Sequence, residues 1–408
     1  MTSPALDLEP ACPGAPSGPT PTGSTVPSDR SDLQVEQRPI DSIPRDAWDE
    51  LAAATPWATP FSTYAFHRAW WDAYGGNAHE QTLVVCRADA SRPVAIVPLM
   101  HRHEVEPTDP MTQSTMRHGG PTTLTPVAPT AKAIFFGATY HADYATVLAP
   151  PEVLPRVAEA VAGHLAAPAS PFDPHPSPWD VVDLRRLRCG DPAAEALATA
   201  FGRREIAEGW TLNVEREDVC PVVRLPEGAS FDDYLGTLGK KERHEIRRKI
   251  RRAETAGDIA LEDSTDPIAD LEAFIDLHQR KWGEKGLFPP TPGGGASRTF
   301  VRRLFEEQGD DGLLRLSFLT VGDKRVAAGL MFQGSSEYLY YNAGVDPDAR
   351  DLSPGVLLVA AYVERALKEG IRRFDFLRGD ESYKYEWGAV DEPIQRLLVR
   401  RDTAKVAA

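Results

Sequence analysis

The sequence predicts an α/β (α+β) protein built from two similar halves, each a mixed, mostly antiparallel sheet flanked by helices. The chain has 408 residues, two to three times the length of a typical domain, so we expect two cores. Both halves show the same order of expected elements: a helix, antiparallel strands, a second helix and a last strand. Both last strands carry Asp-x-x-Arg, beginning at Asp183 and Asp375, with Gly-Asp soon after. A repeat this long indicates two duplicated domains rather than a stacked array.

In the first half, apolar residues recur at helical spacing from Phe61 to Tyr74, and Gly75 follows as a stop signal. Two apolar, β-branched runs at 81–86 and 94–100 are separated by polar residues and predict a hairpin. Further along we expect a strand at 143–148, a helix at 151–165 and a strand at 179–186.

In the second half, the apolar stripe at 271–282 predicts a helix, and the strands that follow are expected at 314–321, 326–332 and 337–343. A helix at 354–369 and a strand within 373–380 complete the order. The Pro- and Gly-rich stretch at 289–295 lacks the Gly-Lys-Ser/Thr ending of a P-loop, and we expect an irregular loop there.

The expected domain limits follow from composition. Of the first 39 residues, 20 are Pro, Ser, Thr or Gly, too polar to repay the entropy of ordering, so we expect 1–39 to be a disordered tail. Residues 40–210 would form the N-terminal domain, 211–400 the C-terminal domain and 401–408 a short tail.

Charge and cysteine content exclude several classes of protein. The net charge of −15 argues against a protein that coats nucleic acid with its whole surface. No apolar run approaches the roughly 20 residues of a membrane helix. The four cysteines lack metal-type spacing, and His101-x-His103 has no evident third ligand, so we expect no metal. Because there is no secretory leader pattern, the expected location is the cytoplasm.

One segment carries a charge opposite to that of the chain. Between residues 240 and 252 lie eight basic residues and two acidic ones, a net charge of +6. Ile246 and Ile250 lie four residues apart, which predicts a helix with one apolar stripe. Its cationic face could bind CoA phosphates, an anionic glycan or lipid acceptor, or the acceptor stem of a tRNA, or it could simply be solvated. The candidate residues are Lys240, Arg247 and Arg251.

A second candidate anion site begins the helix expected at 354–369. Ser353 is placed to cap the helix, and Pro354 suits its first position, where a missing N–H costs nothing. The next three amides would then lack intrahelical acceptors and face a ligand at the positive end of the helix dipole. An ordinary capped helix start without a ligand is the alternative. The amides belong to Gly355, Val356 and Leu357.

Several sequence tracts of the second half resemble those of a known family. The arrangement of residues 312–380 is similar to the GNAT acetyltransferase fold. The tracts at 353–355, 374–380 and 383–388 resemble those of CelD/BcsL-type acetyltransferases, associated with cellulose biosynthesis. The resemblance covers roughly residues 45–400. That family is related to FemABX-type peptidoglycan bridge transferases, which also carry two GNAT-like domains.

The resemblance implies an acetyl-CoA or other acyl-CoA donor in the C-terminal domain, with its pyrophosphate at Arg350–Gly355. The pantetheine arm would lie along the strand at 337–343, against Tyr341 and Asn342. The GNAT phosphate loop usually reads Gln/Arg-x-x-Gly-x-Gly/Ala, and here only Arg350 and Gly355 match it. Aminoacyl-tRNA therefore stays open as an alternative donor. A non-catalytic binding protein stays open as an alternative function. The acceptor would be a small amine, a sugar hydroxyl, or a glycan or cell-envelope precursor.

Acyl transfer needs a base for the acceptor proton and an acid for the departing thiolate. We expect Asp375 or Asp380 as the base and Tyr383 or Tyr385 as the acid. Arg378 could hold a carboxylate or a phosphate through a bidentate fork. The alternative is that Asp375 and Arg378 form a structural ion pair.

Overall fold

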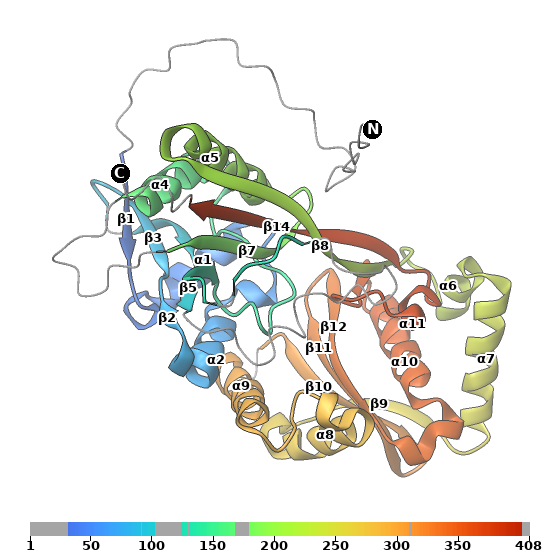
Figure 1. Cartoon of the computed structure of the whole chain (residues 1–408). Coiled ribbons are helices and arrows are strands. Elements are labelled where there is room, and N and C mark those ends of the chain that lie inside the picture. The colour runs from blue at the N-terminus through green and yellow to red at the C-terminus, as the bar shows by residue number, and fades with distance from the viewer. Residues whose placement is uncertain are drawn as a thin grey trace, which may run out of the picture.

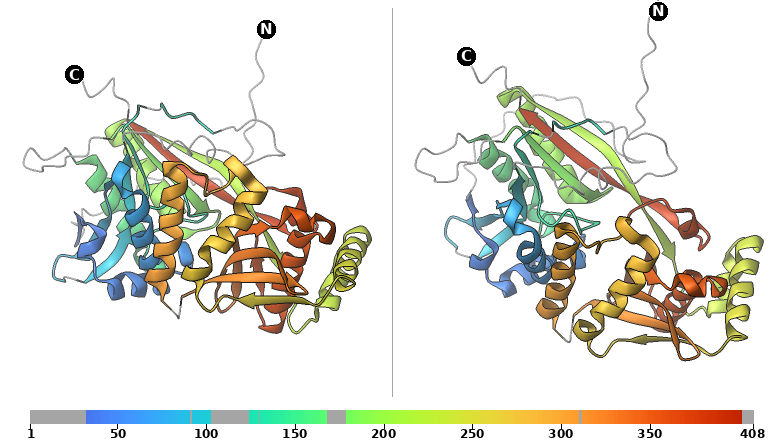
Figure 2. Two further views of the ribbon diagram at one scale, coloured as in Figure 1. Left: turned by 90° about the horizontal axis from the view of Figure 1, so that it is seen from below. Right: turned by 60° about the horizontal axis from the view of Figure 1, so that its bottom comes forward.

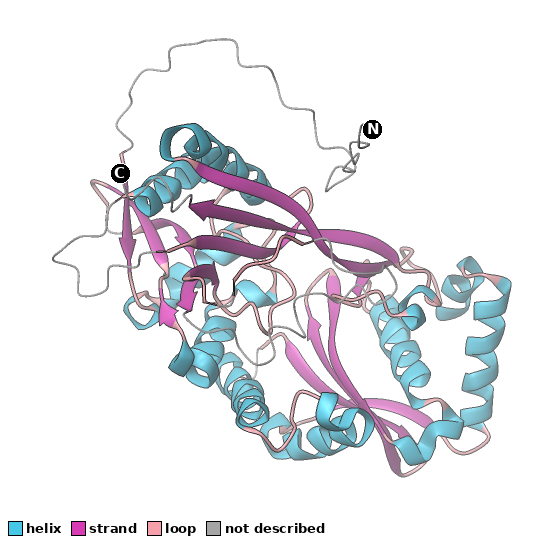
Figure 3. Ribbon diagram, viewed as in Figure 1, coloured by secondary structure: helices cyan, strands magenta, loops and turns pink. Residues whose placement is uncertain are grey.

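A computed structural model describes residues 32–90, 92–102, 124–128, 130–167, 179–309 and 312–401. One sheet of eleven strands runs through both halves of the chain, in the order β2-β5-β6-β7-β14-β8-β13-β12-β11-β10-β9. A second sheet of three strands has the order β1-β3-β4. Helices flank the large sheet, as Figures 1 and 3 show. The fold is the expected mixed α/β architecture.

The elements of the N-terminal half alternate short strands with helices. In chain order they are β1 (Leu33–Gln37), α1 (Arg45–Ala54), α2 (Tyr64–Tyr74), β2 (His79–Glu80), β3 (Leu83–Arg87), β4 (Pro93–Val97), β5 (Leu99–Arg102), β6 (Ala133–Phe136), α4 (Leu154–Ala166), β7 (Val181–Arg188), α5 (Pro192–Glu208) and β8 (Trp210–Arg224).

The C-terminal half opens with helices. Its elements are α6 (Phe231–Thr237), α7 (Lys240–Glu254), β9 (Ile259–Asp263), α8 (Pro267–Trp282), α9 (Pro292–Gln308), β10 (Leu314–Val321), β11 (Lys324–Gln333), β12 (Glu337–Val345), α10 (Pro354–Lys368), β13 (Arg373–Asp375), α11 (Ser382–Tyr385) and β14 (Val390–Arg401). Short 3-10 helices join several of these elements, among them Pro60–Ser62 and Pro347–Leu352.

The repeat expected from the sequence is visible in the strand pairing. In each half, a strand, a helix and a second strand form a crossover with parallel pairing: β6-α4-β7 and β12-α10-β13. Each parallel pair joins three residues of one strand to three of the other, and an aspartate ends both sets. Phe135 faces Asp183 in the first half, and Leu339 faces Asp375 in the second.

The two halves exchange strands, so the boundary expected at 210/211 does not separate them. The last strand, β14, pairs with β7 of the N-terminal half along one edge and with β8 along the other. β8 in turn pairs with β13. Because the chain end completes the first half, the large sheet is continuous.

Four expectations about local structure need correction. Leu33–Gln37, placed in the tail, form β1, because their backbone pairs with β3; residues 1–31 and 402–408 lie outside the described residues. The segment 143–148 is no strand, because a lone bridge from Leu148 to Ile96 replaces a ladder. α9 begins at Pro292, inside the expected loop, because the Thr291 hydroxyl caps the Gly294 amide. The expected strand within 373–380 stops at Asp375.

An aromatic core joins the halves. α2 of the first half lies beside α9 of the second, as Figure 2 shows from two sides. Phe66 meets Phe300 edge to face at 5.2 Å, and Phe61 meets Phe332 at 5.4 Å. Such pairs bury large apolar areas, so the halves form one packed unit rather than two loosely linked domains.

A buried ion pair fixes β14 in the sheet. The Arg396 guanidinium and the Asp183 carboxylate are each 1% exposed and form two parallel bonds of 2.6 and 2.7 Å. Burial alone would raise the pKa of Asp183, but the cations of Arg185 and Arg396 together hold it below its usual value of 3.8. The folded protein therefore gains stability above pH 4 from this group and loses it as the pH falls below that value.

We predict that Arg396→Leu lowers the free energy of unfolding by about 3 kcal/mol at pH 7, because it leaves a buried carboxylate with one cation fewer. Urea unfolding measures the loss. A double variant, Asp183→Leu with Arg396→Leu, should recover most of it and should show a weaker loss of stability between pH 4 and pH 2. An unchanged acid profile in the double variant would contradict this assignment.

Candidate active site

The candidate site is an opening between β12 and β13. Their parallel pairing covers only Glu337–Leu339 and Arg373–Asp375, after which β13 ends while β12 continues to Val345. Within the described ranges, no strand pairs with residues 340–345 on that side of β12. Apart from the Ala343 amide, which donates to Asn342 Oδ1 at 3.0 Å, the peptide groups at this edge can bind an extended ligand in place of a strand.

A β-bulge shapes this edge. Leu330 of β11 faces Asn342, and the next residue, Met331, faces Tyr340, so Tyr341 is the extra residue. The rings of Tyr340 and Tyr341 point to opposite faces of the sheet. Tyr340 packs with Tyr362 of α10, at 6.0 Å between ring centroids. Tyr341 packs with the core that joins the two halves, 5.8 Å from Phe61 and 5.2 Å from Phe332.

The start of α10 differs from the expectation. Ser353 lies in the left-handed region, with φ at 58°, and its side chain does not cap the helix. Instead its hydroxyl accepts a hydrogen bond of 2.8 Å from Arg252 of α7. The amides of Val356 and Leu357 donate to the Ser353 carbonyl, at 2.9 and 3.2 Å. Two of the three amides expected to be open are therefore occupied.

The third amide, at Gly355, has no backbone acceptor among the described residues. A Cβ added at Gly355 would meet only Val345, at 3.8 Å, an ordinary contact. The fold does not itself require a glycine here. A remaining reason for a glycine at position 355 is that it lets a ligand approach the backbone closely. Arg350 is exposed beside this helix start.

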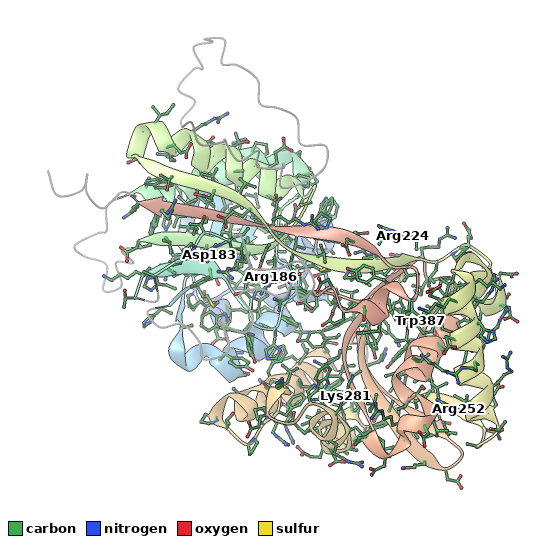
Figure 4. All side chains as sticks on the ribbon, turned by 45° about the vertical axis from the view of Figure 1, so that its right-hand side comes forward. Asp183, Arg186, Arg224, Arg252, Lys281 and Trp387 are labelled. Atoms are coloured by element: carbon green, nitrogen blue, oxygen red, sulfur yellow. The ribbon has the colours of Figure 1, made fainter. Side chains whose placement is uncertain are left out.

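α7 carries the cationic face expected from its sequence. At about 100° per residue, Lys240, Arg247 and Arg251 lie within about 40° of one another on the exposed side. Arg247 pairs with Asp232 at 2.8 Å. Lys240 and Arg251 are about 16 Å apart along the helix axis, and it is the C-terminal end of α7 that contacts the start of α10, where Arg252 donates to Ser353. Figure 4 shows Arg252 at that end.

The expected base Asp375 is completely buried and fully bonded. One of its oxygens accepts from the Tyr144 hydroxyl at 2.7 Å and from Arg373 at 2.8 Å. The other accepts from the Leu377 amide at 2.7 Å. Arg378 binds Asp143 at 3.1 Å, so in place of the alternative ion pair between Asp375 and Arg378 each residue has another partner. These partners favour a structural role for Asp375.

The two candidate acids differ in their surroundings. The Tyr385 hydroxyl donates to Asp391 at 2.7 Å, and burial together with that carboxylate raises the pKa of Tyr385. A phenol held this way is a poor proton donor. Tyr383 is 41% exposed, and its ring meets the edge of Phe376 at 5.9 Å, on the Tyr340 side of the opening. Asp380 lies partly exposed just before α11.

One short segment of the N-terminal half contacts three of the expected site residues. His141 hydrogen-bonds to Tyr341, Asp143 binds Arg378, and Tyr144 donates to Asp375. The sequence alone does not single out this segment, because its partners lie about 200 residues or more along the chain. It follows that both halves build the site.

The sequence analysis missed two buried charged groups near the site. Asp218 is buried near Arg378 and Arg186, and burial, only partly offset by these cations, raises its pKa to about 6. Lys384 is 3% exposed, and its ammonium donates to the carbonyls of Leu377, Arg378 and Gly379 at 3.0, 2.9 and 2.9 Å. It also pairs with Glu381 at 3.0 Å. In the sequence, Lys384 stands between two tyrosines, which is a weak signal for a buried, functional lysine. It is the one signal that the sequence offers for Lys384.

Metal and membrane features can be stated only for the described ranges. They contain no group of three or more His, Cys, Asp or Glu side chains that could hold a metal ion. His103, of the His101-x-His103 pair, lies outside them. No helix in the described part of the chain has the length and apolar character needed to cross a bilayer.

Comparisons with known proteins agree with this geometry. Residues 240–385 match the family model described as "Acetyltransferase (GNAT) domain". No curated protein matches the sequence. The crystal structure of FemX is similar with a TM-score of 0.54 and 10% identity, over 86% of this chain and 96% of that one. At this identity the likeness shows the fold alone.

Two other solved structures are similar at lower scores. A conserved protein of unknown function from Bacteroides thetaiotaomicron has a TM-score of 0.48 and 14% identity, over 88% of this chain and 98% of that one. A tandem GNAT protein from the clavulanic acid biosynthesis pathway has a TM-score of 0.42 and 10% identity, over 90% and 98%. The likeness to a GNAT acetyltransferase domain model lies in the C-terminal half, over residues 240–385.

We predict that Lys384→Met lowers the free energy of unfolding by about 2 to 3 kcal/mol, because three buried carbonyls lose their donor. The amides of residues 377–380 should exchange hydrogen faster, which mass spectrometry after proteolysis measures. Lys368→Met, at an exposed lysine of α10, is the matched control and should change neither quantity. Unaltered exchange at 377–380 in Lys384→Met would refute the role assigned to the ammonium.

Proposed function

We propose that the protein is an acyltransferase that binds acyl-CoA, such as acetyl-CoA, in the opening between β12 and β13. It transfers the acyl group to an amine or a sugar hydroxyl. The observation that carries the proposal is the open edge of β12 beside the start of α10, within the stretch that matches the GNAT domain model.

The donor's anionic end would lie at the start of α10. There the open Gly355 amide, the side chains of Arg251 and Arg252, and Arg350 can bind phosphate oxygens. The amide groups of the pantetheine arm would then pair with backbone groups of residues 340–345 that face no strand, Asn342 among them; the Ala343 amide is excepted, because it donates to Asn342 Oδ1. This geometry requires no open amide at Val356 or Leu357.

The reaction moves one proton from the acceptor nucleophile and one to the departing thiolate. In our proposal Asp380 is the base and Tyr383 the acid, because Asp375 is fully bonded and Tyr385 donates to Asp391. Asp375 positions the chain that leads to Asp380. Arg378, held by Asp143, would face the substrate as a fixed cation.

We further propose the narrower kinship with CelD/BcsL-type acetyltransferases, and hence an acceptor that is a glycan or cell-envelope precursor. The support is the resemblance of the tracts at 353–355, 374–380 and 383–388. Acyl-CoA is made and used in the cytoplasm, where this proposal locates the protein.

A second candidate is aminoacyl transfer from aminoacyl-tRNA. It is supported by the exposed cationic side of α7, which carries Lys240, Arg247 and Arg251 and could track a phosphate backbone. The fold likeness to FemX fits either donor. A protein that binds neither donor would be a non-catalytic member of the fold.

We predict that acetyl-CoA raises the melting temperature of the wild-type protein and that Gly355→Ala weakens its binding about tenfold, because a methyl group blocks the backbone. Calorimetric titration measures the affinity. Gly293→Ala is the control, since Gly293 likewise follows a proline at a helix start and has open space around it. Equal affinities for acetyl-CoA in all three proteins would exclude this site.

Charge reversal on α7 separates the two donors. We predict that Arg251→Glu weakens acetyl-CoA binding and that Lys240→Glu, about 16 Å away, does not. If aminoacyl-tRNA is the donor, both variants should weaken tRNA binding, and the slope of affinity against salt should fall. Arg203→Glu on α5, an exposed arginine of the other half, is the control. If the wild-type protein binds tRNA and does not bind acetyl-CoA, aminoacyl transfer from aminoacyl-tRNA is favoured.

A further inference from the structure

A chain of hydrogen bonds runs from the N-terminal half to the bulge of β12. The Ser297 hydroxyl of α9 lies 2.9 Å from the Tyr74 hydroxyl of α2, which lies 2.8 Å from His141 Nε2. On the other side of the ring, His141 Nδ1 lies 3.1 Å from the Tyr341 hydroxyl. The chain therefore links the interface of the halves to the candidate site.

The imidazole at the centre of this chain is neutral. His141 is 6% exposed, stacks on Phe300 at 4.2 Å between ring centroids, and burial lowers its pKa to about 3. A neutral imidazole has one N–H and one acceptor nitrogen. Each of the two neighbouring hydroxyls must therefore play the complementary role.

Two arrangements of the protons satisfy the chain. In one, Tyr341 donates to Nδ1, the Nε2–H donates to Tyr74, and Tyr74 donates to Ser297, whose proton goes to the Gly293 carbonyl at 3.2 Å. In the other, every bond reverses, and the Tyr341 proton goes to the His141 carbonyl at 3.2 Å.

In both arrangements the Tyr341 oxygen can accept a hydrogen bond from a ligand. Its proton is always directed into the protein, at His141. At least one lone pair of its oxygen receives no hydrogen bond from any described residue. The hydroxyl can thus accept a hydrogen bond from a ligand with the chain intact, whereas donating one would break its bond to the ring or the carbonyl of His141.

The direction of the Tyr341 hydroxyl favours ligand groups that donate a hydrogen bond. A thioester carbonyl and a phosphate offer only acceptors, so binding either would cost Tyr341 its hydrogen bond to His141. An attacking amine or hydroxyl offers an N–H or O–H. The position agrees, since Tyr341 is partly exposed and its ring faces away from α10, whereas the donor phosphates would lie on the α10 side.

We propose that the Tyr341 hydroxyl binds the N–H or O–H of the acceptor nucleophile, and that His141 is the positioning residue that directs the hydroxyl. This inference rests on the proposed acyl transfer and refines it, because it moves Tyr341 from the donor to the acceptor. The acceptor would present an uncharged N–H or O–H to the Tyr341 hydroxyl, whose ring packs on the buried rings of Phe61 and Phe332.

The test uses the full chain, acetyl-CoA and hydroxylamine, a nucleophile small enough to enter any acceptor site. Tyr341→Phe should raise the KM for hydroxylamine about tenfold, the loss of one hydrogen bond, and leave the affinity for acetyl-CoA unchanged. Tyr338→Phe is the matched control, because Tyr338 lies in the same strand and its hydroxyl donates to Glu369. It should change neither quantity.

The positioning role of His141 has its own readout. Tyr74→Phe leaves Tyr341 intact and breaks the chain on the far side of the imidazole, so it should shift the ¹⁵N resonances of His141 and raise the KM for hydroxylamine by a smaller factor. Weaker acetyl-CoA binding by Tyr341→Phe, with an unchanged KM for hydroxylamine, would overturn the inference alone. Failure of the wild-type protein to bind acetyl-CoA would overturn the proposed function and this inference with it.

Discussion

The buried carboxylate of Asp375 is the group on which the arrangement of the site depends. It receives hydrogen bonds from its own strand through Arg373, from the next segment through the Leu377 amide, and from the N-terminal half through Tyr144. The bond to Leu377 holds that residue in the left-handed region, with φ at 58°, and the chain turns out of the strand there. β13 therefore ends after three paired residues, and the edge of β12 stays open.

The duplicated half also has a left-handed residue after its aspartate, Arg186 with φ at 67°, but its strand does not end there. Asp183 occupies the corresponding register position, but its carboxylate binds Arg185 and Arg396, and β7 continues to Arg188. β14 runs along β7 and supplies Arg396, so that half is closed by a strand from the far end of the chain. The same motif thus ends in a closed sheet in one half and an open edge in the other, and the difference lies in the partners of the aspartate.

The sequence predicts well what depends on local periodicity. β10 has the expected bounds, 314–321, and α10 begins at the expected Pro354, because alternation and a proline at the first helical position are local signals. The Ser353 cap failed because the competing partner, Arg252, lies 101 residues away in the chain. The same reason explains the segment 141–144, whose role depends on contacts with residues more than 190 positions later. A single sequence carries no signal for such contacts.

The segment 141–144 gives a physical reason for two halves in one protein. Through His141, Asp143 and Tyr144 it sets the hydroxyl of Tyr341, the guanidinium of Arg378 and the carboxylate of Asp375, which all belong to the other half. The proposed donor would approach from the side of α7 and α10, where exposed cations attract its phosphates. Tyr341 packs on buried aromatic rings and beside a neutral imidazole, which offer nothing to an anion. The two substrates can then meet only across the open edge of β12, each from the side whose chemistry suits it.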